Sequence, residues 1–221
     1  MKPTNAPAPM GERSSSWTGR AREEVAERLP IENLLPDRQP YYVGSWVYVF
    51  GVVTIAALVL TVLSGVILAI AGPDWWHISA AGRFFNSLHF WSVQVFFVFM
   101  VLHLWGQYFM ASWRGGRATT WMIGVVIFAI SIGAAFTGYL SQQNFASQWI
   151  GVSAKDALNA AGLGAFLNVL NFGQMYGIHV MLLPATIIVL VALHIVWVRM
   201  KGVVPPIASP RQPARHSTSE V

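Results

Sequence analysis

Cysteine is absent from this chain of 221 residues. Its absence excludes a disulfide framework, cysteine-ligated zinc or iron–sulfur clusters, and any cofactor attached through a thioether bond. Charged residues are also scarce, at 10% of the chain against 55% hydrophobic residues. This composition is typical of membrane proteins. Any redox centre in the chain therefore needs ligands other than cysteine.

No cleaved secretory signal is predicted, because the first forty residues contain no sufficiently long apolar core. Within them, residues 18–29 predict a short amphipathic helix with Val25 and Leu29 on one side. That helix either lies along a membrane surface or is simply solvated. We expect three parts: an N-terminal segment at 1–42, a membrane domain at 43–202 and a disordered tail at 203–221.

Long apolar stretches are what the chain does have. Four segments reach the roughly 20 helical residues that cross a bilayer, and each is predicted to be helical because lipid offers no partner to an open backbone. They are residues 44–71, 84–110, 120–140 and 174–200. We expect Pro184 to kink the last segment without ending it. Within the long connection at 141–173, residues 153–170 predict one or two short helices.

Positive charge is concentrated on one side of this topology. Of the 14 Lys and Arg residues, only Arg83 and Lys155 lie in the first and third connections between the segments. Because cytoplasmic loops carry an excess of Lys and Arg, both termini are predicted to be cytoplasmic. This distribution accounts for the net charge of +5 without nucleic acid, so no nucleic-acid partner is expected.

Four of the 6 histidines lie inside two apolar segments, where polar residues usually mark function. His89 and His103 are fourteen positions apart, and His179 and His194 are fifteen apart. At about 100° and 1.5 Å per residue, each pair stays on roughly one helix face, with its members about 21 to 22 Å apart. Both helices run inward, so His89 shares an outer level with His179, and His103 an inner level with His194.

These two cross-helix pairs predict two haems, each with its iron held between two imidazoles. Such iron has no open position for substrate, so the expected task is electron transfer and no catalytic residue is assigned. The alternative is that each histidine only forms a hydrogen bond to a neighbouring helix. Zinc is disfavoured, because no third or fourth ligand clusters with either pair. His77 and His216 are expected to be solvent-exposed.

Paired glycines repeat the histidine spacing. Gly51 and Gly65 in the first segment, and Gly124 and Gly138 in the third, are each fourteen apart. They predict a side-chain-free spot at each haem level, where a porphyrin edge approaches the backbone. Ordinary packing of small residues between helices is the competing explanation.

Together these residues resemble the amino-terminal, haem-bearing half of cytochrome b, and its separate four-helix form, cytochrome b6. The resemblance covers residues 24–205 and rests on the glycines and on "LHFWSVQVFFVFMVLH", "TTWMIGVVIFAISIGAAFTGY" and "GIHVMLLPATIIVLVALHIVWVRMKG". It implies an all-α membrane protein, a four-helix bundle enclosing two non-covalent b-type haems. The low-potential haem would lie at the outer level, and the high-potential haem at the inner level.

The resemblance also implies the function and the partners. The chain would be the cytochrome b subunit of a quinol:acceptor oxidoreductase of the bc or b6f type, inactive alone, in a bacterial cell membrane. Quinol would be oxidised at the outer face, passing one electron to a Rieske iron–sulfur protein and the other through both haems to a quinone. Further implied partners are a subunit like the carboxy-terminal half of cytochrome b, a cytochrome c-type or plastocyanin-type acceptor, membrane lipid and a second copy of the complex.

Several positions depart from the family pattern. Gly106 stands where an arginine commonly binds a haem propionate, three residues after the inner histidine. Asn86 stands where the b6 type has arginine, leaving Arg83 as the candidate substitute. Trp149 and Gly151 match a pair that borders the outer quinol pocket. The Pro-Glu-Trp-Tyr motif of quinol oxidation must come from another subunit, and no covalent haem c is expected because its cysteine is missing.

Two rival functions stay open at the level of sequence. One is a di-haem membrane anchor for another dehydrogenase or reductase that has no Rieske partner. The other is a haem-free scaffold or transporter that uses the histidines as proton relays.

Overall fold

A computed structural model describes residues 16–28 and 46–204, and every regular element in these ranges is helical. The first range holds α1 (Trp17–Arg28), which confirms the short helix expected at 18–29. Val25 is exposed, and Arg28 forms an ion pair with Glu24 one turn earlier. Leu29 and most of the predicted tail lie outside the described residues. The unit that contains α1 is separate from the membrane unit.

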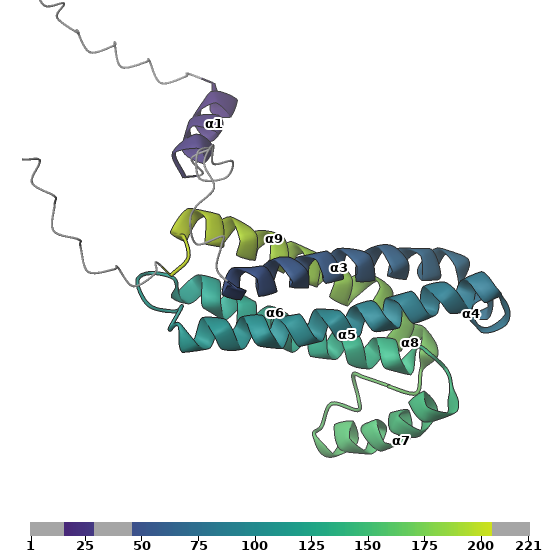
Figure 1. The fold of residues 1–221 in the computed structure, drawn as a ribbon. Coiled ribbons are helices and arrows are strands. Elements are labelled where there is room, and N and C mark those ends of the chain that lie inside the picture. The colour runs from purple at the N-terminus through teal and green to yellow at the C-terminus, as the bar shows by residue number, and fades with distance from the viewer. Residues whose placement is uncertain (1–15, 29–45, 205–221) are drawn as a thin grey trace, which may run out of the picture. The chain divides into compact units, whose positions relative to one another are not determined.

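Four long helices form the membrane unit, and each is long and apolar enough to span a bilayer (Figure 1). They are α3 (Trp46–Ala71), α5 (Ala80–Phe109), α6 (Ala118–Leu140) and the continuous run Phe172–Lys201. All four predicted segments are therefore confirmed. Within the unit, α3 packs mainly against α5, and α6 mainly against α9. The protein is thus an all-α integral membrane protein.

The fourth helix changes its geometry part-way along. It comprises α8 (Phe172–Gly177), a π-helical turn η2 (Ile178–Leu182) and α9 (Leu183–Lys201). In the π turn the N–H of Leu183 donates to the carbonyl of Ile178, five residues earlier. The helix continues through Pro184, as predicted, and only Leu183 separates the π turn from that proline.

Two shorter helices lie in the connections. The first, α4 (Pro73–Ile78), has no counterpart in the prediction. It is followed at once by α5, whose first turn is capped by the Ser79 hydroxyl accepting from the Gly82 N–H. The second, α7 (Phe145–Ala160), is capped by Asn144 and begins upstream of the stretch predicted to be helical. The rest of that connection forms turns.

Small hydroxyl side chains share the interior of the bundle with apolar ones such as Phe96 and Met100. Ser64 and Ser131 are almost wholly buried. Large apolar residues such as Ile70 and Phe109 are instead more than four-fifths exposed. This is the reverse of a soluble protein, and it suits a helix bundle surrounded by lipid. Small interior side chains also leave room between the helices, and the histidines face that room.

Candidate cofactor-binding sites

The structure brings the two outer histidines together. His89 on α5 and His179 in η2 have ring centres 6.2 Å apart, with their planes nearly perpendicular. Imidazole–metal bonds in zinc sites are about 2.0–2.1 Å, so two imidazoles on opposite sides of one metal have ring centres about 6 Å apart. The spacing of this pair therefore fits a shared metal ion between the rings.

Backbone carbonyls fix the orientation of both outer rings. His89 Nδ1 lies 2.9 Å from the carbonyl oxygen of Thr61, and His179 Nδ1 lies 2.9 Å from that of Ala134. A carbonyl oxygen only accepts, so each Nδ1 carries the hydrogen and donates it. Each Nε2 is then left with its lone pair free, which is the tautomer a metal ligand requires.

A hydroxyl supports each of these bonds. Ser64 Oγ lies 3.2 Å from His89 Nδ1, and Thr137 Oγ1 lies 3.5 Å from His179 Nδ1. The same order recurs on α3 and α6: a carbonyl, then a hydroxyl three residues later, then a glycine. Sequence reasoning missed both hydroxyls. The sequence did contain a signal for them. A Ser or Thr directly precedes Gly65 and Gly138, the two glycines beside the outer histidines, whereas neither Gly51 nor Gly124 follows such a residue.

The four paired glycines make room for imidazoles. At each one, the atoms nearest to where a Cβ would lie belong to a histidine of the neighbouring helix. The pairs are Gly51 with His103, Gly65 with His89, Gly124 with His194 and Gly138 with His179. The sequence had assigned this space to a porphyrin edge. The structure shows that a side chain there would first meet the candidate ligand itself.

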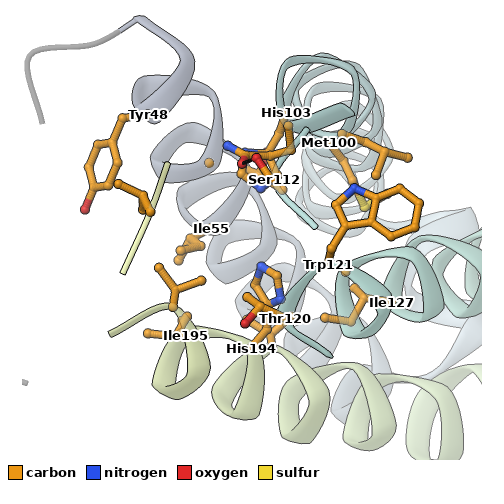
Figure 2. Close-up of a pocket in the computed structure, with 18 of the residues that line it drawn as sticks. Tyr48, Ile55, Met100, His103, Ser112, Thr120, Trp121, Ile127, His194 and Ile195 are labelled. Carbon is orange, nitrogen blue, oxygen red and sulfur yellow. Dashed lines mark hydrogen bonds between the residues drawn. The ribbon is translucent and has the colours of Figure 1, made fainter. Parts of the chain in front are cut away.

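The two inner histidines line one cavity of about 260 Å³ (Figure 2). His103 Nδ1 is buried without a hydrogen-bond partner. The His194 ring interacts with the backbone of Thr120, but its Nδ1 forms no hydrogen bond of acceptable geometry. The inner pair therefore lacks the firm backbone bonds of the outer pair.

Two further cavities, of about 150 and 590 Å³, are both lined by His89 and His179. Arg83, which is exposed and donates to the carbonyl of Ile78 at 3.3 Å, lines the larger one. Asn86 lines it too, and exchanges two hydrogen bonds of 3.1 and 3.0 Å with Gln142. Where the b6 type has an arginine, this chain thus has an amide pair that joins α5 to the turn after α6.

Unpartnered polar atoms coincide with these cavities. Within the described residues, every buried side-chain nitrogen or oxygen without a hydrogen-bond partner belongs to a residue that lines one of the three. These residues are Thr61, Trp76, His103, Arg117, Thr120, Trp121, Ser131 and His194. Buried polar groups in proteins are nearly always hydrogen-bonded. The cavities therefore have the character of ligand sites.

The family profile described as "Cytochrome b(N-terminal)/b6/petB" matches residues 94–217, more than half of the chain. This chain belongs to the cytochrome b N-terminal/b6 family. Its relatives include the menaquinol:cytochrome c reductase cytochrome b subunit of Bacillus subtilis, 27% identical over 86% of this chain and 92% of that protein. Cytochrome b6 of Heliobacterium modesticaldum is 26% identical over 85% of this chain and 94% of that protein.

A solved structure shares the fold of this cytochrome b. A chain of a hyperthermophilic respiratory Complex III aligns with a TM-score of 0.62 at 20% identity, over 82% of this chain. The aligned part covers 53% of that chain, so this cytochrome b spans about half of its length.

In this cytochrome b, the π turn brings the two histidine spacings into agreement. His179 and His194 are one residue further apart than His89 and His103. η2 begins one residue before His179, continues toward His194 and holds one residue more than a regular α turn. The extra residue is therefore absorbed there, and His194 is not rotated away from the cavity that it shares with His103.

Two predicted residues lie apart from the cavities. Trp149 on α7 is 68% exposed, and Gly151 packs against Leu170 and Leu140. Neither lines any of the three cavities. Among the residues that the structure describes, no group of three or more His, Cys, Asp or Glu could hold a metal ion. Candidate iron ligation in this part of the chain therefore rests on the histidine pairs.

Proposed function

We propose that this cytochrome b carries electrons across a membrane through two b-type haems. His89 and His179 would hold the outer haem, and His103 and His194 the inner one. The observation that carries the proposal is the outer pair, with ring centres 6.2 Å apart and each Nδ1 bonded to a carbonyl. The region 43–202 would form the haem-binding domain.

Haem iron, when bound, supplies reversible one-electron transfer. The protein's part is to hold and insulate it. The Thr61 and Ala134 carbonyls keep the Nδ1 hydrogen of each outer histidine in place, so that Nε2 points away from the backbone. The apolar helices exclude water from both levels. Fourteen residues at about 1.5 Å separate the two levels by about 21 Å along α5, so the levels can pass charge across most of the bilayer.

The relatives support a role in quinol oxidation. The Bacillus subtilis relative is a subunit of a menaquinol:cytochrome c reductase. We infer that this chain serves a quinol:acceptor oxidoreductase, with quinol and quinone as substrates, and a Rieske protein, a carboxy-terminal cytochrome b subunit and a cytochrome c-type acceptor as partners. The complex would be a homodimer in a bacterial cell membrane, with both termini in the cytoplasm. Trp149 and Gly151 would reach quinol only with that second subunit in place.

Histidine variants test the ligand assignment. In membranes or in the purified complex, we expect two haems b per chain in the wild type. His89→Ala and His179→Ala should each remove the same haem, and His103→Ala and His194→Ala the other. His77→Ala, outside the four spans, is the control and should keep both. Loss of haem in a different pairing, or two haems retained in a ligand variant, would refute the assignment.

A further inference from the structure

The larger cavity beside the outer histidines contains a buried donor that has no acceptor. Trp76 on α4 lines this cavity of about 590 Å³, is only 5% exposed, and has no hydrogen-bond partner for its Nε1 atom. An indole N–H can only donate a hydrogen bond, and buried polar groups are nearly always paired. The indole therefore points to a ligand that supplies an acceptor.

The packing of α4 against the first turn of α5 places Trp76 relative to the outer histidines. A Cβ at Gly82 would lie 2.7 Å from Trp76 Cα, so the two helices meet there without room for a side chain. Positions 82, 86 and 89 follow the i, i+4, i+7 spacing of a single face of α5. Trp76 therefore lies about two turns from His89, toward the start of α5 and on the side that carries Asn86. Figure 1 shows α4 at this end of α5, opposite the loop that leads into α6.

The amide pair of Asn86 and Gln142 adds further donors to the same cavity. Each side chain donates one hydrogen bond to the other, at 3.1 and 3.0 Å. A primary amide has two N–H donors, so one N–H of each amide is not used by the pair. The next residue, Gln143, has a φ of 53°, which is uncommon for a residue other than glycine and fixes the turn that carries Gln142.

The donors in this cavity are neutral. Among the described residues that line it, Arg83 is the only Lys or Arg, and none is Asp or Glu. The Arg83 side chain is exposed and donates to the carbonyl of Ile78, within the connection from α4 to α5. The sequence left Arg83 as the substitute for the arginine that the b6 type has at position 86. The structure instead provides an indole and two amides there, and no carboxylate of these lining residues competes for them.

We propose that Trp76 donates a hydrogen bond to a carboxylate of the outer haem, with the unused N–H groups of Asn86 and Gln142 as neighbouring donors. The proposal rests on the proposed function, because the carboxylates are the propionate side chains of the haem that His89 and His179 would hold. Neutral donors bind a carboxylate without cancelling its charge. The negative charge beside the iron then opposes the arrival of an electron, so this donor set lowers the potential of the outer haem.

Redox titration of the visible spectrum, in membranes that contain the complex, tests this assignment. In Trp76→Phe, which keeps an aromatic ring and removes the N–H, the outer haem should become at least threefold harder to reduce, or about 28 mV for one electron. The inner haem should keep its potential. Trp75→Phe is the matched control and should shift neither haem, because Trp75 is on the same short helix but does not line the cavity.

A second variant should shift the same haem in the opposite direction. In Asn86→Arg, the outer haem should become at least tenfold easier to reduce, or about 59 mV, because a cation then pairs with the carboxylates. When Trp76→Phe is added to Asn86→Arg, its shift should be smaller than in the wild-type background, since both groups act on one acceptor.

Three results would overturn the assignment. The first is an unchanged outer potential in Trp76→Phe, and the second is an equal shift in Trp75→Phe. The third is a shift that disappears once quinone is extracted, which would make a quinone oxygen the acceptor. If Trp76→Phe does not assemble, Asn86→Arg decides the question, and an unchanged outer potential in that variant counts against the proposal. A wild type without two haem components would refute the proposed function instead.

Discussion

At the scale of single residues, the two levels of the bundle are built differently. Each outer histidine donates from Nδ1 to a carbonyl and lies beside a hydroxyl, from Ser64 or Thr137. His103 Nδ1 has no partner, and the His194 ring has only its interaction with the Thr120 backbone. A bonded Nδ1–H makes an imidazole a stronger electron donor to a metal, so a haem held by the outer pair would have the lower potential.

A glycine substitution tests whether the space beside an outer ligand is needed. A Cβ at Gly138 would lie 2.9 Å from both ring nitrogens of His179, whereas a Cβ at Gly133 on the same helix meets nothing within 4 Å. Overpacking of this kind costs roughly 1–3 kcal/mol. Gly138→Ala should therefore lose or weaken the outer haem and keep the inner one. Gly133→Ala should leave the haem spectrum unchanged, and equal spectra in both variants would contradict this account.

At the scale of elements, the π turn is what aligns unequal spacings. η2, which ends two residues before Pro184, takes up the extra residue between His179 and His194. In a regular α-helix, one extra residue turns the ligand by about 100°. The wide turn thus lets α5 and the fourth helix present their histidines at matching levels.

Two single-residue deletions test whether η2 aligns His194 with His103, as distinct from any deletion simply destabilising the helix. Deleting Met181, inside the π turn and 73% exposed, should convert the turn to α geometry and keep both haems. Its cost should appear in thermal stability, because the proline then clashes with the preceding turn. Deleting Val189, in regular α9, should rotate His194 away and remove only the inner haem. Haem content per chain is the measurement, and the opposite pattern would refute the role of η2.

The elements were predictable from the sequence to different degrees. The four spans could be predicted because a run of about 20 apolar residues is the length that crosses a bilayer as a helix. The continuation of the last helix through Pro184 could be predicted because apolar residues follow the proline. α4 could not, because six residues are too few for a periodic signal. The π turn was signalled only by the unequal histidine spacing. The hydrogen bonds to Thr61 and Ala134 carbonyls were invisible, since any residue supplies a carbonyl.

At the scale of the whole molecule, apolar side chains face outward, and positive charge lies beyond one end of the spans. The loop between α5 and α6 carries Arg114 and Arg117, and the fourth span ends with Arg199 and Lys201. Lys and Arg are retained on the cytoplasmic side of membranes. This distribution supports the prediction of cytoplasmic termini, which would put α7 on the outer side.

The absence of cysteine makes this orientation directly testable. Arg114→Cys and Lys155→Cys each introduce the sole thiol of the chain at an exposed position. In intact cells, a membrane-impermeant maleimide should label position 155 in α7. Position 114 should be labelled only after the cells are opened. Labelling of position 114 in intact cells would invert the topology and exchange the outer and inner levels.

The central claim is that one chain holds two haems at two depths, and a redox titration of its visible spectrum tests this most directly. In wild-type membranes that contain the complex, two b-type components should titrate separately, each with one electron. In His103→Ala, only the component of higher potential should disappear. A single component in the wild type, or no haem spectrum at all, would contradict the account.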